Sequence, residues 1–283
     1  MKMAKKTQVL NCGKFRMALG ETTRVMGILN ITPDSFFDGG KYLNAEEAVS
    51  RALQMESEGA DIIDIGGESS RPGAQEMGAE EESARILPVI KALASRLNIP
   101  ISIDSRNSGV AQQALEAGAS MINDIGGLRS PGMIKAAADS GVPVVLMHMQ
   151  NDPLTMQSNP AYESVVSDLL AFFRERVEAV NRAGISNDRI VIDPGIGFGK
   201  NIDHNLEILK NLSRFHELGF PLLIGTSNKS FIGKILDLRV DQRSEGSLAT
   251  VSLAAWMGIQ IVRVHDVRGT VRAVRVIDAI RNA

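Results

Sequence analysis

The chain alternates between two kinds of segment along nearly its whole length. Eight short, almost continuously apolar runs of strand length take turns with segments in which apolar residues recur at helical spacing. The apolar runs cover residues 24–30, 61–67, 101–105, 120–125, 143–149, 189–195, 221–227 and 259–266. Runs that are apolar throughout are typical of parallel strands covered by helices. The alternation therefore constrains the chain to a parallel α/β fold.

Eight strand–helix units without a linker predict one TIM (β/α)8 barrel. We expect residues 1–283 to form a single domain, with the barrel proper at about 24–283. A doubly wound open sheet is the alternative. The first twenty-odd residues lie outside the eight units, and we expect a short hairpin or cap over the barrel floor there.

Composition excludes several classes of protein. The net charge is −2, so the chain has no basic excess for binding nucleic acid. Its single cysteine, Cys12, allows no internal disulfide or Cys-rich zinc site and fits a reducing compartment. No apolar run has the length of a signal peptide or a membrane span. We expect a soluble cytoplasmic protein with no nucleic acid or membrane as partner.

The strand ends carry polar side chains, which are costly to bury without partners. In chain order they are Asn30, Asp64 with Glu68, Asp104, Asn123 with Asp124, His148, Asp193, Lys229, and Arg263 with His265. In a TIM barrel, the loops after the strands meet at one mouth, where the active site lies. We therefore expect these side chains to face a common mouth and to bind a ligand there.

Each of these residues also has a purely structural interpretation. A single Asp or Asn at a strand end usually caps a helix or turn. His148 is more often a hydrogen-bonded core histidine than a catalyst. Gly195, Gly197 and Gly199 look like a phosphate loop, but their spacing fits neither common glycine motif. The functional interpretation depends on the coincidence of all eight strand ends.

The chemistry of the mouth is limited by the side chains available to it. The sequence shows no Ser-His-Asp set, activated cysteine or zinc ligand cluster. Carboxylates and amides can hold a flat heterocycle with N–H and carbonyl groups, whereas Arg71, Lys229, Arg263 and His265 can hold anions. A polar heterocycle joined to a phosphate group would use both sets.

Several motifs are specific, and together they cover nearly the whole chain. They are GILNITPDSFFDGG (27–40), IDIGGESSRPGA (63–74), INDIGG (122–127), LMHMQ (146–150), IDPGIGFGKN (192–201), SNKSFIG (227–233) and RVHDV (263–267). In this order they resemble the dihydropteroate synthase family. The resemblance implies Mg²⁺-dependent condensation of 6-hydroxymethyl-7,8-dihydropterin diphosphate with 4-aminobenzoate, in a homodimeric TIM-barrel enzyme that sulfonamides inhibit.

The resemblance also implies roles for individual residues. The expected pterin pocket consists of Asp104, Asn123, Met147, Asp193, Phe198 and Lys229. The diphosphate would lie against Asn30, Arg263 and His265, with Mg²⁺ held partly by Asn30. The aminobenzoate would be bordered by Ser70, Arg71 and Pro72. The residues expected to carry catalysis are Asp104, Lys229, Arg263 and His265.

Some residues depart from the family pattern. Ser70 stands where the family usually has Thr, and Asn228 stands where it usually has Arg; Arg106 could compensate for that arginine. Two alternatives remain at this point: a related barrel that transfers a methyl group from a folate to a corrinoid protein, and a non-catalytic binding paralogue. The glycine-rich loops at 32–44 and 68–78 lead us to expect that aminobenzoate binds after the pterin diphosphate.

Overall fold

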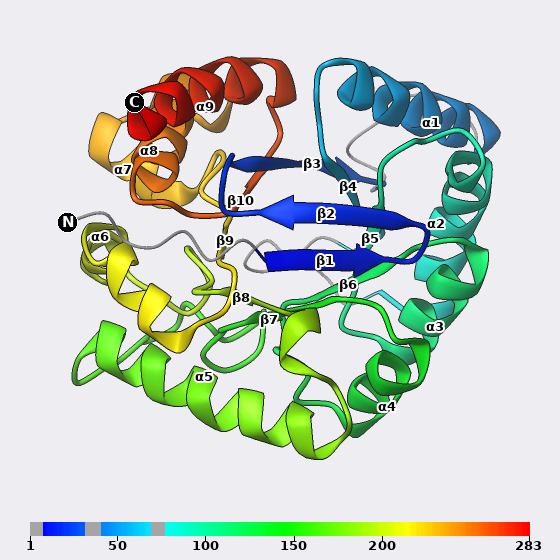
Figure 1. The fold of residues 1–283 in the computed structure, drawn as a ribbon, viewed down its shortest axis with the longest axis horizontal. Helices are drawn as coiled ribbons and strands as arrows, with labels where there is room; N and C mark the ends of the chain where they lie inside the picture. The colour runs from blue at the N-terminus through cyan, green and yellow to red at the C-terminus, as the bar shows by residue number, and fades with distance from the viewer. Residues whose placement is uncertain (1–7, 32–40, 69–76) are drawn as a thin grey trace.

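Eight parallel strands form a closed ring in the computed structural model, which describes residues 8–31, 41–68 and 77–283 (Figure 1). The strands are β3 (Arg24–Asn30), β4 (Ile62–Gly66), β5 (Ile101–Asp104), β6 (Met121–Asp124), β7 (Val144–Met147), β8 (Ile190–Asp193), β9 (Leu223–Ile224) and β10 (Ile261–Val264). A parallel bridge between Ile192 and Leu222 joins β8 to the segment that leads into β9 and closes the ring. The predicted TIM barrel is confirmed, and the open-sheet alternative is wrong.

The helices surround the ring of strands (Figure 1). They are α1 (Lys41–Ser57), α2 (Ala79–Ala94), α3 (Ser108–Ala117), α4 (Pro131–Ser140), α5 (Val165–Arg182), α6 (Ile202–Lys210), α7 (Ser230–Leu236), α8 (Ser244–Trp256) and α9 (Val267–Asn282). Short 3₁₀ turns cover Asn187–Arg189, Leu212–Leu218 and Val240–Gln242. Among the described helices, none combines the length and the apolar character that a bilayer crossing requires.

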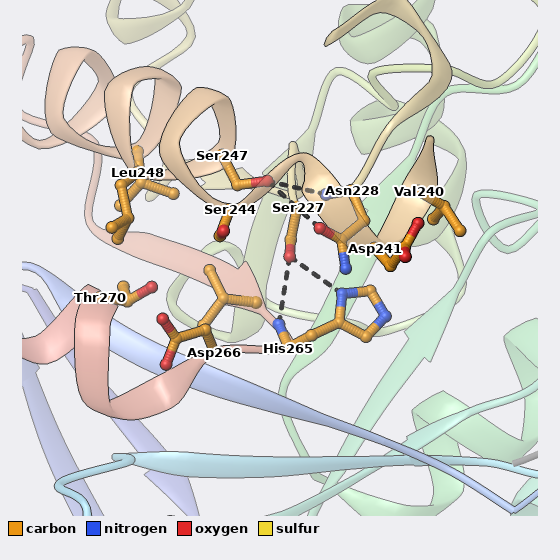
Figure 2. A pocket seen from close by; sticks show the side chains of 12 residues that line it. Ser227, Asn228, Val240, Asp241, Ser244, Ser247, Leu248, His265, Asp266 and Thr270 are labelled. Carbon is orange, nitrogen blue, oxygen red and sulfur yellow. Dashed lines mark hydrogen bonds between the residues drawn. The ribbon is translucent and has the colours of Figure 1, made fainter. Parts of the chain in front are cut away.

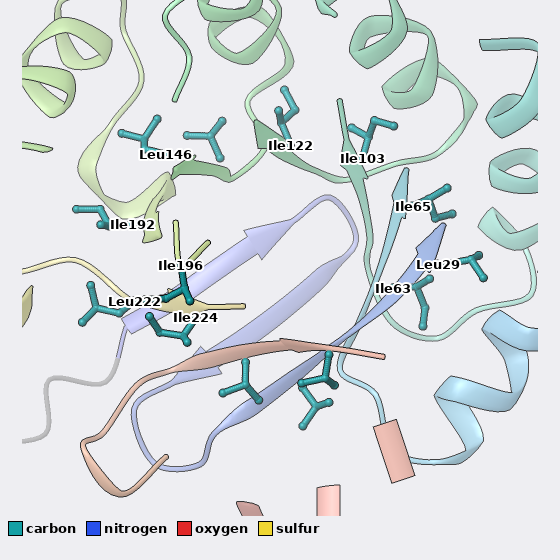
Figure 3. Close-up of a cluster of buried hydrophobic side chains, with 14 of the residues drawn as sticks. Leu29, Ile63, Ile65, Ile103, Ile122, Leu146, Ile192, Ile196, Leu222 and Ile224 are labelled. Carbon is teal, nitrogen blue, oxygen red and sulfur yellow. The ribbon is translucent and has the colours of Figure 1, made fainter. Parts of the chain in front are cut away.

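The outer faces of the strands form the main hydrophobic core. Successive side chains of a strand point to opposite faces, so Ile63 and Ile65 of β4 lie on the same side. Both belong to the cluster that packs against the helices, as do Ile103 and Ile122 of the next two strands. Figure 3 shows these side chains distributed around the ring. The inner faces near the barrel floor are also apolar. Both faces of each strand are therefore apolar there, which explains the almost continuous apolar runs in the sequence.

A two-stranded hairpin covers the floor of the barrel, as predicted from the N-terminal position of its residues. β1 (Gln8–Cys12) pairs antiparallel with β2 (Phe15–Leu19), and the hairpin lies across one opening of the ring (Figure 1). Its buried side chains pack onto the inward residues at the start of the barrel strands. These floor residues are Met26, Ile62, Met121, Val145, Val191, Leu223 and Ile261. Each fully buried apolar side chain contributes about 1.5–3 kcal/mol, so the hairpin stabilises the floor considerably.

The strand expected at 221–227 is only two residues long. Pro221 has no N–H to donate to a neighbouring strand, and the chain turns shortly after β9, where the Lys229 N–H donates to the Thr226 carbonyl at 3.2 Å. Asn228 occupies the centre of this turn with a φ of 58°. The turn places Lys229 directly before α7, at the end of the barrel opposite the hairpin.

Candidate functional site

The alternation of side chains along each strand determines which polar strand ends enter the barrel. Floor residues face the interior, so residues two or four positions further along the same strands face it too. These inward residues are Asn30, Asp64, Asn123, Met147, Asp193 and Arg263. The barrel interior therefore changes from an apolar floor to a polar layer near the mouth.

Arg263 links carboxylates from two other strands inside the barrel. Its Nε donates to Asp64 Oδ2 at 2.6 Å, and its Nη2 donates to Asp104 Oδ2 at 2.5 Å. Asn123 Nδ2 also donates to Asp64 Oδ2, at 3.1 Å. Asp64 has no exposed surface at all, so its charge depends on these donors rather than on water.

The arginine keeps its charge in this setting. Burial lowers the pKa of Arg263, but the Asp64 and Asp104 carboxylates raise it further, so the net pKa lies above its ordinary value. Burial raises the pKa of Asp104, while Arg263 opposes that rise. Two buried oxygens nearby, Asp64 Oδ1 and Ser102 Oγ, have no hydrogen-bond partner among the described residues. Buried polar atoms normally have a hydrogen-bond partner in the protein or in water, and the two residues that carry these oxygens are register partners on β4 and β5.

A second wall of the mouth carries one acid and one base with shifted pKa values. Burial raises the pKa of Asp193 to about 6, although the Gly195 N–H, donated to Asp193 Oδ1 at 2.8 Å, opposes the rise. Burial and Arg263 lower the pKa of Lys229 to about 8. The Lys229 ammonium lies 3.9 Å from the centroid of the Phe198 ring. Between about pH 6 and 8 the wall therefore presents a carboxylate and an ammonium together.

In the glycine-rich loop after β8, two backbone N–H groups that could bind an anion donate to protein side chains instead. Gly195 has a φ of 69°, and a Cβ there would lie 2.0 Å from the His148 carbonyl oxygen, so only glycine fits. The Gly195 N–H is used by Asp193, and the Gly197 N–H donates to Asn205 Oδ1 at 2.7 Å. The loop therefore positions Phe198 and does not cradle a phosphate with these two N–H groups.

Two of the polar residues at the strand ends, His148 and Asp124, do not face the mouth, which corrects the expectation that all of them do. His148 contacts Phe172 edge-on at 4.8 Å between ring centroids, and its Nδ1 lies 3.0 Å from the ammonium of Lys200. Asp124 accepts hydrogen bonds from the Gly126 and Leu128 N–H groups at 2.7 and 2.8 Å. Both follow an inward residue by one position and so point to the helix side. The structural interpretations, a core histidine and a turn cap, hold for this pair.

The remaining predicted residues fall into three groups. Asn30 ends β3 at the mouth, and His265 follows β10 with its Nδ1 2.9 Å from Ser227 Oγ. Ser70, Arg71 and Pro72 lie outside the described residues, as do most of the two loops on which the predicted binding order rests. Arg106, named as a possible substitute for the arginine missing at position 228, pairs with Glu68 at 3.1 Å through two nitrogens.

Sequence reasoning assigned no contact to three residues that organise the site. Asp64 anchors Arg263, and Ser227 contacts His265. Asn205 of α6 holds the glycine-rich loop. The sequence could have indicated the role of Asp64, because a carboxylate within an apolar run needs a partner when it is buried. The other two are ordinary polar residues whose contacts arise only from the packing of distant segments.

Comparisons with known proteins give a consistent result. The sequence profile of the family described as "Pterin binding enzyme" matches residues 26–265. Dihydropteroate synthase from Escherichia coli K12 is 47% identical over 259 residues, which cover 92% of each chain. A Yersinia pestis dihydropteroate synthase solved with a sulfonamide drug complex superposes with a TM-score of 0.93 at 44% identity, covering 98% of this chain and all of that one. The Xanthomonas albilineans enzyme with 4-aminobenzoic acid superposes with a TM-score of 0.92, also at 44% identity and the same coverage.

We predict that replacing Arg263 by methionine lowers the free energy of unfolding by about 3–5 kcal/mol, because Asp64 is left charged and buried without a partner. Urea denaturation at pH 7 measures the loss. The double variant Asp64→Asn with Arg263→Met should recover part of it, since no unpaired charge remains.

The matched control for this prediction is Arg174→Met. Arg174 pairs with Glu217 at 2.9 Å, but the two side chains are 59% and 42% exposed. Exposed pairs contribute at most about 1 kcal/mol, so this variant should be nearly as stable as the parent. A similar small loss for Arg263→Met would contradict the importance of the buried network.

Proposed function

Because this chain belongs to the dihydropteroate synthase family of pterin binding enzymes, we propose that its polar mouth binds the pterin ring and the diphosphate of one substrate. The enzyme condenses 6-hydroxymethyl-7,8-dihydropterin diphosphate with 4-aminobenzoate and releases 7,8-dihydropteroate and diphosphate. This identification decides against the two alternatives, methyl transfer to a corrinoid protein and a non-catalytic paralogue. The observation that carries the proposed site is the row of acceptor oxygens at the mouth.

Hydrogen bonds within the protein leave three side-chain oxygens of this row for a ligand. Asn123 uses its NH₂ group on Asp64, which fixes the amide orientation and leaves Oδ1 as an acceptor. Asp104 uses Oδ2 on Arg263, and Asp193 uses Oδ1 on the Gly195 N–H, so each keeps its other oxygen. The aminopyrimidine edge of a pterin carries several N–H donors and matches three acceptors.

Lys229 completes the proposed pterin pocket as a hydrogen-bond donor, whereas the three oxygens are acceptors. Its ammonium is a donor beside the acceptor row, suited to the ring carbonyl and a ring nitrogen of the pterin. Met147 and Phe198 are both almost fully buried at the same wall and supply apolar surfaces for the faces of the ring. Together these residues can distinguish a pterin from an apolar ring of the same size.

Catalysis in this proposal consists mainly of stabilising the leaving diphosphate. As the carbon–oxygen bond breaks, negative charge develops on the diphosphate. Arg263 uses only two of its five N–H groups on Asp64 and Asp104, so it can still donate to a phosphate oxygen. His265, which directly follows β10, supplies a second donor to the diphosphate. The amine of aminobenzoate is neutral near pH 7, so its attack needs no strong general base.

The mouth fits a magnesium ion that is held mainly by the substrate. Asn30 offers an amide oxygen, a ligand type that Mg²⁺ accepts. No group of three or more His, Cys, Asp or Glu side chains that could hold a metal occurs among residues 8–31, 41–68 and 77–283. Mg²⁺ commonly keeps several waters and binds substrate phosphates with few protein ligands. When bound, the ion would act as a Lewis acid on the diphosphate.

The aminobenzoate side of the proposed site involves Ser70, Arg71 and Pro72, which lie outside the described residues. Arg71 is suited to the carboxylate of aminobenzoate because a guanidinium binds carboxylates through two parallel hydrogen bonds. The buried, thiol-bearing Cys12, whose pKa burial raises to about 12, is consistent with our proposal that the enzyme works in the reducing cytoplasm.

We also propose that the enzyme is a homodimer joined through an apolar face on α7 and α8. This α7–α8 face carries exposed large side chains, which are Ile235, Leu236, Leu253 and Trp256. Trp256 is 54% exposed, and contact with a second copy of the chain would remove this apolar surface from water. A second copy of the chain would bring the same residues to the contact, as a two-fold interface requires.

The decisive test of the function is a diphosphate-release assay. With Mg²⁺ present, the protein should release diphosphate from 6-hydroxymethyl-7,8-dihydropterin diphosphate only after 4-aminobenzoate is added. Excess EDTA should stop the release, and added Mg²⁺ should restore it, because the leaving group is a polyanion. Release without aminobenzoate would argue against the condensation, and full activity in EDTA would argue against the metal.

Asp193→Asn should weaken binding of 6-hydroxymethyl-7,8-dihydropterin by about a hundredfold, since charge-assisted hydrogen bonds contribute about 1.5–3 kcal/mol each. Calorimetry measures the affinity, and Asp203→Asn on the exposed surface of α6 is the control. Because the pKa of Asp193 is about 6 and that of Lys229 about 8, affinity in the parent protein should fall below pH 6 and above pH 8. Unchanged affinity in the variant would remove Asp193 from the pocket.

Trp256→Glu should convert the dimer to a monomer, because the interface would have to bury two new charges related by symmetry. Sedimentation velocity measures the change in mass. Leu154→Glu is the control, since Leu154 is equally exposed but lies in the segment between β7 and α5, away from the α7–α8 face. A dimer that persists in the Trp256 variant would place the interface elsewhere.

A further inference from the structure

We propose that Ser227 is a positioning residue that holds the neutral imidazole of His265 in the tautomer with its proton on Nε2. His265 then presents an N–H donor to an anion without having to be positively charged. The functional part of this inference rests on the proposed role of His265 toward the diphosphate. The structural part depends only on contacts between Ser227 and its neighbours.

The Ser227 hydroxyl contacts His265 in two places. Its Oγ lies 2.9 Å from His265 Nδ1 and 3.2 Å from the backbone nitrogen of the same residue (Figure 2). A backbone N–H can only donate, so Oγ accepts that bond. The hydroxyl proton then has Nδ1 as its acceptor, because the described residues offer Ser227 Oγ no other partner. In this arrangement Nδ1 is the acceptor and is unprotonated in the neutral ring, so the ring proton lies on Nε2.

The opposite arrangement would leave a hydroxyl proton unpaired. If Nδ1 carried the proton, Ser227 Oγ would accept two hydrogen bonds and its own proton would have no acceptor. Ser227 is 8% exposed and borders the cavity beside His265, so only a water in that cavity could accept the proton instead. A buried unpaired donor costs about 1–3 kcal/mol, which is enough to favour one tautomer about five- to hundredfold.

The turn that carries Ser227 is itself fixed by α8. Asn228 has a φ of 58°, a left-handed conformation that asparagine adopts more readily than most residues. Its N–H donates to Ser247 Oγ at 3.0 Å, and its carbonyl accepts from Arg243 Nη1 at 3.1 Å. Ser247 Oγ in turn donates to the Arg243 carbonyl at 2.7 Å. The turn is therefore held from both sides, and Ser227 has little freedom to rotate away from the imidazole.

The same turn separates the mouth from a cavity of about 150 Å³ between α8, α9 and the end of β10 (Figure 2). His265 borders this cavity, so its ring is not packed tightly on all sides. The contact with Ser227 Oγ therefore contributes to the orientation of the ring.

Two functional groups of the proposed site are thus set by one turn. Ser227 fixes the proton of His265, and Lys229, two residues later, contacts the Phe198 ring. The Nε2–H donor is present whether the imidazole is neutral or protonated, because protonation adds a proton at Nδ1 only. His265 can therefore donate to a diphosphate oxygen in either protonation state.

The experiment compares Ser227→Ala with Ser227→Thr, which keeps the hydroxyl. Proteins labelled with ¹⁵N-histidine are studied by NMR at pH 8, and His265→Gln identifies the His265 signals among those of the four histidines. The parent protein and the threonine variant should show an unprotonated Nδ1 and a protonated Nε2. The alanine variant should show both nitrogens shifted toward the average of the two tautomers. A protonated Nδ1 in the parent, or an unchanged signal in the alanine variant, would overturn the proposal.

Binding of inorganic diphosphate with Mg²⁺, measured by calorimetry at pH 8, tests the functional part. Ser227→Ala should weaken it by about tenfold, Ser227→Thr should restore it, and Ser244→Ala, at an exposed serine on the same cavity, should leave it unchanged. If His265→Gln weakens binding but Ser227→Ala does not, the inference is overturned while the proposed site stands. If neither variant weakens binding, the proposed contact between His265 and the diphosphate is overturned instead.

Discussion

The ion pair between Arg263 and the fully buried Asp64 is the interaction on which the rest of the mouth depends. A carboxylate without exposed surface is tolerated only with strong donors, and Arg263 and Asn123 provide them at 2.6 and 3.1 Å. Arg263, Asp64 and Asn123 thus form a polar layer in the barrel interior, next to the apolar floor. The N-terminal hairpin seals that floor, so charges and hydrophobic contacts occupy separate levels of the same barrel.

The buried network also determines what the mouth can recognise. Each protein–protein hydrogen bond uses a particular atom and leaves another one for the ligand. Asn123 is the clearest case, because its NH₂ group is committed to Asp64 and its oxygen is left as an acceptor. The proposed pterin pocket is therefore prepared before the substrate arrives, and little side-chain reorganisation is needed. Preorganised dipoles of this kind are the usual basis of electrostatic catalysis.

Residues behind the mouth contribute by holding its walls. Lys200 donates to the Phe198 carbonyl at 2.9 Å and lies beside His148, and Asn205 accepts the Gly197 N–H. These contacts fix the loop whose Phe198 ring lies against Lys229. The turn at Asn228 does the same on the other side of Lys229. The two loops that present the proposed binding groups after β8 and β9 are thus rigidly supported, although neither is regular secondary structure.

The sequence by itself determined the barrel, the floor hairpin and the polar character of the strand ends, because these follow from local periodicity and from the cost of burying polar groups. It did not determine which strand ends enter the mouth. Asn123 and Asp124 are adjacent, yet only the phase of the pleat sends one inward and the other to a turn. Nor could it reveal the pairing of Asp64 with Arg263, since 199 residues separate them. Such contacts are decided by the closure of the ring, which brings together strands that no local pattern relates.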